Sequence, residues 1–402
     1  MALTVTHYSI QFMFIIKHYL SFGSCMPYQR FLVPLAGPAK AMALALALAL
    51  ALGQVAAHAR DGTTPASLAP GLLAPGLPPG PICTTTGKAV DEKGFVPIGG
   101  IEQWVRIKGS RCANPIVVLI HGGPGNPTTP FADNFYKAWE KDFTIVQWDQ
   151  RGAGMTYGRN PPAEDEPLLV ERLRDDGLEV ARFAARRFGK RKVILMGGSW
   201  SSVLGVHMVK SDPKMFCGYI SSSQVVGPLP TQASIDATMA LARAAGDGEA
   251  VARTEALGPL PWTNPRSPGI FRRVIRKYEG LRTEPVPKAW TTYPPEYTTP
   301  KAEADYTAGE DYSWLQFVGM HGDGIASKID LTKLGPKFEV PFYMVQGQED
   351  LLTMPEPSKR YFDSIQAPRK QFVLVPRAGH DPSPPMVDAQ YRLLMENFAD
   401  CR

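Results

Sequence analysis

The 402-residue sequence predicts an α/β protein built on a mostly parallel sheet that helices cover on both faces. Its short apolar runs, rich in Val, Ile and Leu, lack the alternation of a half-exposed strand, which favours strands buried on both faces. Longer amphipathic stretches separate these runs, so strand and helix alternate along the chain. The alternation stops between residues 225 and 334, where we expect an inserted, mainly helical cap.

Residues 1–59 have the features of an export signal. They contain no acidic residue, and Arg30 and Lys40 precede an apolar run of roughly a dozen residues. A small-x-small sequence ending at Ala59 is a suitable cleavage site. A membrane anchor is the alternative, although a spanning helix needs about 20 apolar residues. We therefore expect a leader cleaved after Ala59, a mature chain with no stable membrane span, and a secreted or periplasmic location.

Residues 60–86 are rich in Pro and Gly and carry little charge, which predicts a linker. Cys83 and Cys112 flank a predicted hairpin that turns near residues 98–100. Folding the two strands together would bring these cysteines within bridging distance, so we expect a disulfide, with buried free thiols as the alternative. No CxxC or HxxxH spacing suggests a metal site, and we expect neither a metal nor a cofactor.

The core of the fold is expected over residues 87–224 and 335–402, on either side of the cap at residues 225–334. We interpret the apolar runs of these two parts as strands and their amphipathic stretches as helices. The expected strands are residues 115–120, 143–148, 192–196, 218–223, 341–346 and 371–375, and the expected helices are residues 166–188, 200–210 and 385–399.

The charge balance excludes one class of partner. Lys and Arg number 43 against 38 Asp and Glu, and part of this small excess lies in the leader. The rest of the sequence has no basic run and no basic stripe interleaved with aromatic residues. Such a sequence lacks the electrostatic footprint of a nucleic-acid-binding protein. We therefore expect no nucleic-acid partner.

The stretch "MGGSWSS" places Ser199 directly after one expected strand and before an expected helix. A nucleophile elbow needs this context, because a sharp strand-to-helix turn lifts the serine above the carboxyl end of the sheet. Small residues two positions away on either side let the backbone fold tightly, and Gly197 meets this need. Ser201 stands where glycine is usual, so a small residue with a Cβ meets it on the other side.

The motif "HGGPG", residues 121–125, also follows an expected strand. Its glycines let the backbone approach a substrate closely, and the N–H groups of Gly123 and Trp200 are candidate donors to a developing oxyanion. His121 is a candidate base, but its place at a strand end within a glycine turn favours a structural hydrogen bond.

A third strand end, in "WDQRGAGMT", carries Asp149 and Arg151 into another glycine turn. We expect these two residues to pair or cap and so to hold the turn near the site. A nucleophilic Asp149 is the alternative, although no neighbouring sequence argues for it.

Two later strand ends carry an acid and a histidine, in the order Ser, acid, His. "VQGQED" places Asp350 after one expected strand, and "VPRAGHDPS" places His380 after the next. In open α/β sheets, site residues gather at the carboxyl ends of parallel strands. Glu349 and Asp381 are rival acids, and we favour Asp350. The sequence thus predicts a triad of Ser199, His380 and Asp350.

With these motifs assembled, the chain resembles the α/β-hydrolase superfamily, and within it the proline iminopeptidase family of serine peptidases. "HGGPG", "DQRGAG", "GGSW", "VQGQED" and "AGH" carry the resemblance, which extends from around residue 94 to the C-terminus. It implies Ser199 as nucleophile, His380 as base, Asp350 as the acid that orients the base, and Gly123 with Trp200 as oxyanion donors.

Two departures from the family concern the elbow and the specificity. Ser201 replaces the elbow glycine, and the cap lacks the Trp-x-x-Trp-Glu segment that gives typical members an acid for the substrate's free amino terminus. Glu310 and Asp311, in "AGEDYSW", are candidate acids for such an ammonium group, although an acidic pair in a polar stretch is more often solvated surface.

The resemblance implies a serine hydrolase, most simply an aminopeptidase that removes N-terminal residues from short peptides, and the leader implies that it is exported. One alternative is an esterase or acyl-amide hydrolase on the same scaffold. Another is a non-catalytic binding protein that keeps the fold.

Overall fold

The computed structural model describes residues 76–77, 82–83, 87–163 and 165–401. The expected leader, its cleavage site after Ala59 and the first part of the expected linker lie outside the described residues. Where the linker is described, it contacts the folded chain. The Leu77 N–H donates to the carbonyl oxygen of Phe95 at 2.9 Å. Leu77 and Ile82 also pack against the apolar core, so this end of the linker belongs to the fold.

Among the described residues, eight strands form one sheet in the order β1-β2-β4-β3-β5-β6-β7-β8. β1 pairs antiparallel with β2 and β2 with β4, whereas the other neighbours are parallel. The expected hairpin turns at Gly99 and Gly100, whose φ values of 58° and 80° suit a two-residue turn. The strands are β1 (Val90–Ile98), β2 (Ile101–Gly109), β3 (Ile116–Ile120), β4 (Thr144–Trp148), β5 (Val193–Ser199), β6 (Phe216–Gln224), β7 (Phe342–Gly347) and β8 (Lys370–Val375).

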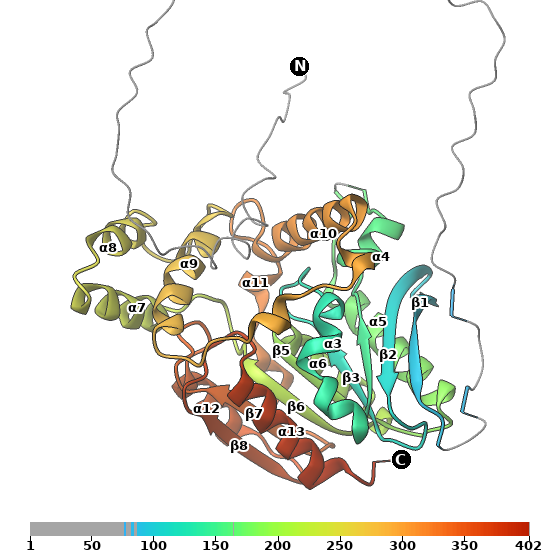
Figure 1. The fold of residues 1–402 in the computed structure, drawn as a ribbon. Coiled ribbons are helices and arrows are strands. Elements are labelled where there is room, and N and C mark those ends of the chain that lie inside the picture. The colour runs from blue at the N-terminus through green and yellow to red at the C-terminus, as the bar shows by residue number, and fades with distance from the viewer. Residues whose placement is uncertain (1–75, 78–81, 84–86, 164, 402) are drawn as a thin grey trace, which may run out of the picture. The chain divides into compact units, whose positions relative to one another are not determined.

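Helices join the strands and make up the long segment between β6 and β7 (Figure 1). Within the described chain, no helix has both the length and the apolar character needed to cross a bilayer. The helices are α3 (Ala132–Phe135), α4 (Gly154–Arg159), α5 (Val170–Arg187), α6 (Trp200–Ser211), α7 (Gln232–Ala244), α8 (Gly248–Glu255), α9 (Ser267–Gly280), α10 (Pro300–Val318), α11 (Ile325–Lys328), α12 (Pro355–Ser364) and α13 (Pro384–Phe398).

Both faces of the sheet are buried, as β3 illustrates. Its residues Ile116, Val118 and Ile120 belong to one apolar core, which also contains side chains of α5, α6 and α12. Val117 and Leu119 belong to a second core, which contains side chains of α13. Successive side chains of a strand point to opposite faces, so a strand covered on both sides is apolar throughout. The expected fold class, a mostly parallel sheet with helices on both faces, is confirmed.

The insertion between β6 and β7 is helical, and three of its helices begin directly after a residue whose side chain caps the helix N-terminus. The side chains of Thr231, Asp247 and Thr299 each accept the backbone N–H three residues later, at the first turns of α7, α8 and α10. Helices α7 to α9 then share a small apolar core of their own, in which Phe271 and Ile275 are almost completely buried. Figure 1 shows α7 to α10, in yellow and orange, spread across the view above the sheet.

Two disulfides close the fold. Cys83 is bonded to Cys112, as expected from their positions around the hairpin. Cys217, in β6, is bonded to Cys401, just after α13. The second bridge fastens the C-terminal helix to the middle of the sheet, and every cysteine in the described part of the chain is paired.

Candidate active site

Ser199 lies at the residue where β5 turns directly into α6. Its backbone has φ 57° and ψ −128°, outside the regions that residues with side chains ordinarily adopt. Such a conformation costs on the order of 1–3 kcal/mol and persists only where the surrounding structure enforces it. Trp200 is the first residue of α6, so the helix itself offers its N–H no acceptor. The elbow therefore presents a hydroxyl and a backbone donor side by side.

The buried hydroxyl of Ser201 holds the elbow at the position where the G-x-S-x-G motif has its second glycine. Its Oγ accepts the Gly198 N–H at 2.8 Å and lies 2.8 Å from the carbonyl oxygens of Ile120 and Gly198. Ile120 is the last residue of β3, so this hydroxyl ties the elbow to the neighbouring strand. A Cβ added to Gly197 would lie 2.9 Å from the same oxygen, which explains why glycine is required there.

The "HGGPG" loop passes directly beside the nucleophile. A Cβ added to Gly122 would lie 3.5 Å from the Ser199 Cβ and 3.3 Å from the Gly198 carbonyl oxygen. The Gly123 N–H belongs to the next peptide unit, on the same short turn. Gly123 has φ 111°, which side chains disfavour, so the turn depends on glycine.

The His121 ring stabilises this loop through hydrogen bonds to its backbone and to Gln150. Its Nε2 accepts the Gln150 N–H at 3.1 Å, and its Nδ1 lies 2.8 Å from the Gly122 carbonyl oxygen, to which it donates. Burial lowers the pKa of His121 to about 4, so the ring is neutral at neutral pH. This is the structural role that its place in the glycine turn predicts.

Ser199, His380 and Asp350 meet at the carboxyl ends of three parallel strands. The His380 Nε2 lies 2.9 Å from the Ser199 Oγ, and its Nδ1 lies 3.1 and 3.2 Å from the two Asp350 oxygens. His380 is 8% exposed and Asp350 only 1%. Shielding from water strengthens the electrostatic interaction between the two side chains. The structure therefore brings together the three residues that the sequence singled out.

Asp350 is fixed by donors that the sequence analysis missed. Thr353 donates its N–H at 2.7 Å and its hydroxyl at 2.6 Å, and the Gln346 amide donates at 2.9 Å. Burial alone would raise the pKa of Asp350, but His380 and the hydrogen bonds outweigh it and lower that pKa below its ordinary value. The carboxylate is thus ionised and oriented toward the imidazole. Aspartate side chains commonly accept backbone N–H groups of the residues that follow them in a turn, and this tendency is the sequence signal for these contacts.

The rival acids are turned toward the insertion. Glu349 forms an ion pair with Arg282, which follows α9. Asp381 pairs with two arginines of α9 at 2.7 and 3.1 Å. Of the three candidate acids, Asp350 is the one whose carboxylate contacts the His380 ring.

Asp149 and Arg151 hold the neighbouring turn. The Asp149 carboxylate accepts the Thr129 hydroxyl at 2.6 Å and the Met155 N–H at 2.9 Å, at the start of α4. Burial raises the pKa of Asp149 to about 7. Arg151 pairs with the buried Asp176 at 2.9 Å. Both oxygens of Asp149 are engaged in structure, which supports the capping role over a nucleophilic one.

Glu310 and Asp311 have different surroundings in the structure. Glu310 contacts the end of the "HGGPG" loop, because its Oε1 accepts the side-chain N–H of Asn126 at 2.5 Å. A Cβ added to Gly125 would lie 3.0 Å from the Glu310 Cα, so α10 is packed against this loop. Burial raises the pKa of Glu310, as an anion away from bulk water requires. Asp311, the next residue of α10, is exposed to solvent.

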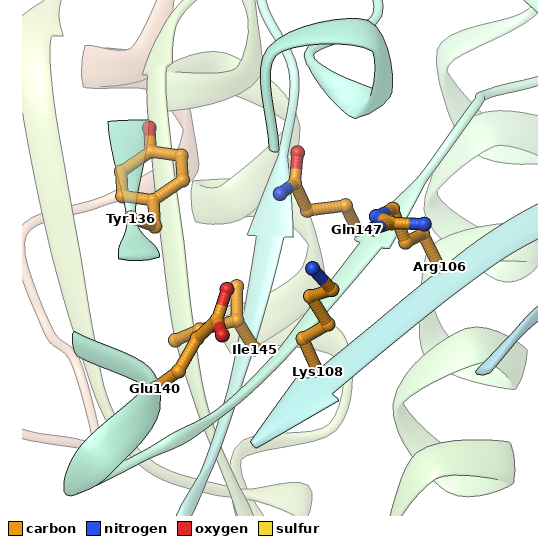
Figure 2. A pocket seen from close by; sticks show the side chains of 6 residues that line it. All are labelled: Arg106, Lys108, Tyr136, Glu140, Ile145 and Gln147. Atoms are coloured by element: carbon orange, nitrogen blue, oxygen red, sulfur yellow. The ribbon is translucent and has the colours of Figure 1, made fainter. Parts of the chain in front are cut away.

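A small pocket lies away from the triad, between β2, β4 and the 3-10 helix Lys137–Lys141 (Figure 2). It offers about 10 Å³, close to the space of one water molecule, which is far too little for a peptide. The cationic side chains of its wall pair with Asp133. The lining side chains are those of Arg106, Lys108, Tyr136, Glu140, Ile145 and Gln147.

The chain is similar to known serine peptidases over most of its folded length. The family model described as "Serine aminopeptidase, S33" matches residues 111–383, which include the elbow, the "HGGPG" loop, the acid and the base. "Probable aminopeptidase YbaC" of Bacillus subtilis (strain 168) is 26% identical over 71% of this chain and 89% of its own. "Probable proline iminopeptidase" of Streptomyces coelicolor is 24% identical over 67% of this chain and 84% of its own.

Solved structures show the same fold. The proline iminopeptidase of Mycobacterium smegmatis aligns with a TM-score of 0.54 and 19% identity, over 76% of this chain and 98% of its own. The structure titled VinJ aligns with a TM-score of 0.55 and 18% identity, over 77% of this chain and 99% of its own. At this level of identity, the alignments establish the α/β-hydrolase fold alone.

Proposed function

The chain belongs to the serine aminopeptidase S33 family, and we propose that it is an exported aminopeptidase that releases N-terminal residues from short peptides. The observation that carries this proposal is the continuous chain of contacts from Ser199 through His380 to Asp350. A hydroxyl, an imidazole and a buried carboxylate in this order form the machinery of nucleophilic acyl transfer.

The reaction follows from these contacts. The His380 Nε2 takes the Ser199 hydroxyl proton while the Oγ attacks the scissile carbonyl carbon. The N–H groups of Gly123 and Trp200 donate to the oxyanion, and each such donor contributes about 100- to 1000-fold in rate. His380 then gives the proton to the leaving amine, which departs from the acyl-enzyme. Asp350 holds the Nδ1–H tautomer and stabilises the imidazolium throughout.

Water completes the cycle on the same groups. His380 removes a proton from the water molecule as it attacks the acyl carbon, and returns that proton to the Ser199 Oγ when the ester bond breaks. The products are the released N-terminal residue and the shortened peptide. The chain's own residues supply every proton transfer in this scheme.

Glu310 is the residue that we propose for recognition of the free amino terminus. Its carboxylate is half-buried and contacts Asn126, at the end of the loop that borders Ser199. In an aminopeptidase substrate the ammonium group and the scissile carbonyl belong to the same residue and are separated by a single Cα, so an anion beside this loop is suitably located. The raised pKa of Glu310 supports the role, because a cation nearby would relieve the desolvation of its carboxylate.

The two disulfides support export. Structural disulfides form and persist in oxidising compartments and are rare in the cytosol. A protein with every described cysteine paired therefore suits the secreted or periplasmic location that the leader predicts. Mass spectrometry of the protein recovered outside the cytoplasm should give an N-terminus at Arg60.

The test is hydrolysis of prolyl, alanyl and N-acetyl-alanyl chromogenic amides and of a short-chain ester by the chain from Arg60. We expect turnover of the free-amine amides, and its loss in Ser199→Ala. Turnover confined to the ester or to the blocked amide would contradict the aminopeptidase assignment and leave only the hydrolase scaffold.

Glu310→Gln tests the recognition of the amino terminus, with Asp311→Asn as its matched control. Loss of one charged contact should lower kcat/KM for the free-amine amides by about 10- to 100-fold, mainly through KM. The ester should be unaffected, because it carries no ammonium group. Equal losses in the two variants, or an equal loss on the ester, would exclude this role for Glu310.

A further inference from the structure

Asp350 lies in the loop that follows β7, which we call the acid loop, and His380 lies in the loop that follows β8, which we call the base loop. Loop residues keep catalytic geometry only when other groups hold their backbone. One side chain from the insertion contacts both loops. It is Glu279, in the last turn of α9, and it is 5% exposed.

The Glu279 carboxylate accepts one backbone N–H from each loop. Its Oε1 accepts the Leu351 N–H at 2.8 Å, directly after Asp350. Its Oε2 accepts the His380 N–H at 3.3 Å. A single rigid carboxylate therefore spans the acid loop and the base loop and fixes the distance between them.

The glycine of the "AGH" motif makes this approach possible. A Cβ added to Gly379 would lie 3.0 Å from the Glu279 Oε2 and 3.3 Å from its Cβ. Contacts of 3.0–3.4 Å are tighter than almost all real Cβ contacts, so a side chain at Gly379 would push the carboxylate away from the His380 N–H. The glycine of the motif therefore leaves the space that the Glu279 carboxylate needs in order to reach the His380 N–H.

Two arginines of α9 contact the acidic side chains around the His380 backbone. The Arg272 guanidinium lies 3.4 Å from Glu279 and 2.7 Å from Asp381, the residue after the base. Arg276 contacts Asp381 at 3.1 Å. The His380 N–H and the side chain of the following residue are thus both attached to one helix.

We propose that Glu279 is a positioning residue for the catalytic base: it sets the spacing of the acid and base loops and supplies a negative charge behind His380. The proposal rests on the proposed function, because it concerns the same triad. The groups that contact Glu279 are all donors, two backbone N–H groups and a guanidinium, which is the arrangement of an ionised carboxylate. Its charge favours the imidazolium that forms when His380 takes the serine proton.

The charged groups around Glu279 come from three elements. Arg272 faces it from α9, Asp350 from the acid loop, and His380 and Asp381 from the base loop. Burial raises the pKa of Glu279, and Arg272 offsets part of this effect. With the three carboxylates ionised and Arg272 and Arg276 protonated, the cluster carries one net negative charge, which the imidazolium neutralises.

The test compares Glu279→Gln and Glu279→Ala by the rate at which a fluorophosphonate modifies Ser199, measured from pH 5 to 9. This readout needs the triad and no particular substrate. The alanine variant should react about 100-fold more slowly, because misplacement of a catalytic group by about 1 Å costs that much. The glutamine variant retains one acceptor oxygen and should recover part of the rate.

The pH profile separates positioning by a charge from simple structural support. The acid limb of the profile is the range in which the rate of modification falls as the pH is lowered. In Glu279→Gln this limb should move to lower pH by about one unit, since the imidazolium loses a neighbouring negative charge. Glu249→Gln, an exposed glutamate of α8 that pairs with Arg253, is the matched control and should leave both rate and limb unchanged. Circular dichroism of each variant verifies the fold.

Each outcome has one meaning. An unshifted acid limb in a folded Glu279→Gln protein, or wild-type reactivity of both variants, would overturn the positioning role while leaving the triad intact. Failure of the wild-type protein to react at all would overturn the proposed function instead. If Glu279→Ala does not fold, the limb of Glu279→Gln still decides the question.

Discussion

Replacing Ser201 with the glycine of the G-x-S-x-G elbow motif should destabilise this protein. The Ser201 hydroxyl is completely buried, accepts the Gly198 N–H and donates to a carbonyl oxygen at 2.8 Å. Removing it leaves a buried donor and a buried acceptor each short of a partner, which costs about 1–3 kcal/mol. Glycine in a helix costs roughly a further 0.5–1 kcal/mol, because its backbone loses more conformational entropy on folding. We expect a loss of about 2–4 kcal/mol in Ser201→Gly, and slightly less in Ser201→Ala.

Urea unfolding of the chain from Arg60 measures this loss as a lower midpoint with an unchanged m-value. Ser211→Ala is the matched control, because this exposed serine ends the same helix and should change the free energy of unfolding by less than about 0.5 kcal/mol. The Ser201 hydroxyl also ties the elbow to Ile120, so kcat should fall about tenfold with little change in KM. A Ser201→Gly protein as stable and as active as wild type would refute this reasoning.

Three further predictions follow from the site and its surroundings. Asp350→Asn should lower kcat by about 10⁴-fold with little change in KM, because an amide no longer holds the correct imidazole tautomer, whereas Glu349→Gln should cost less than about tenfold in the same steady-state assay. Burial holds the pKa of His121 at about 4 against 6.5 when unfolded, so its contribution to stability is present above pH 6.5 and is lost as the pH falls toward 4. That contribution is about 3 kcal/mol, and urea midpoints at pH 7 and 4.5 should show a weaker pH dependence in His121→Gln than in wild type. Replacing Cys217 and Cys401 together with serine should lower the free energy of unfolding by up to about 5 kcal/mol, because their bridge closes a long loop; an unchanged urea midpoint would contradict this.

The strands and the triad could be predicted because local sequence determines them. An apolar run without alternation marks a strand buried on both faces, and a small-residue turn after it marks a strand end. The expected strand 192–196 nevertheless stops short of β5, which continues to Ser199. The strand pairs with β6 through the glycines of the elbow, and glycine in a sequence argues against a strand until its partner is known.

The contacts made by the insertion could not be predicted, because they join residues far apart in the sequence. Glu279 lies 72 positions before Leu351 and 101 before His380, and nothing around it distinguishes it from a solvated helix residue. The bridge from Cys217 to Cys401 spans 184 positions and was one of several possible pairings. Only the packing of α9 against the loops after β7 and β8, and of α13 on the sheet, makes these partners neighbours.

The insertion is one segment of sequence, but it supports two separate parts of the site. On one side, α10 packs on the loops before the elbow: the Ser313 hydroxyl donates to the Gly152 carbonyl oxygen at 2.7 Å, and a Cβ on Gly125 would lie 2.8 Å from the Ser313 Cβ. On the other side, α9 holds the acid and base loops through Glu279. Moving either helix outward would break contacts with residues that adjoin the triad. The insertion is therefore an integral part of the geometry of the site, because α10 holds the loops before the elbow and α9 holds the loops that carry Asp350 and His380.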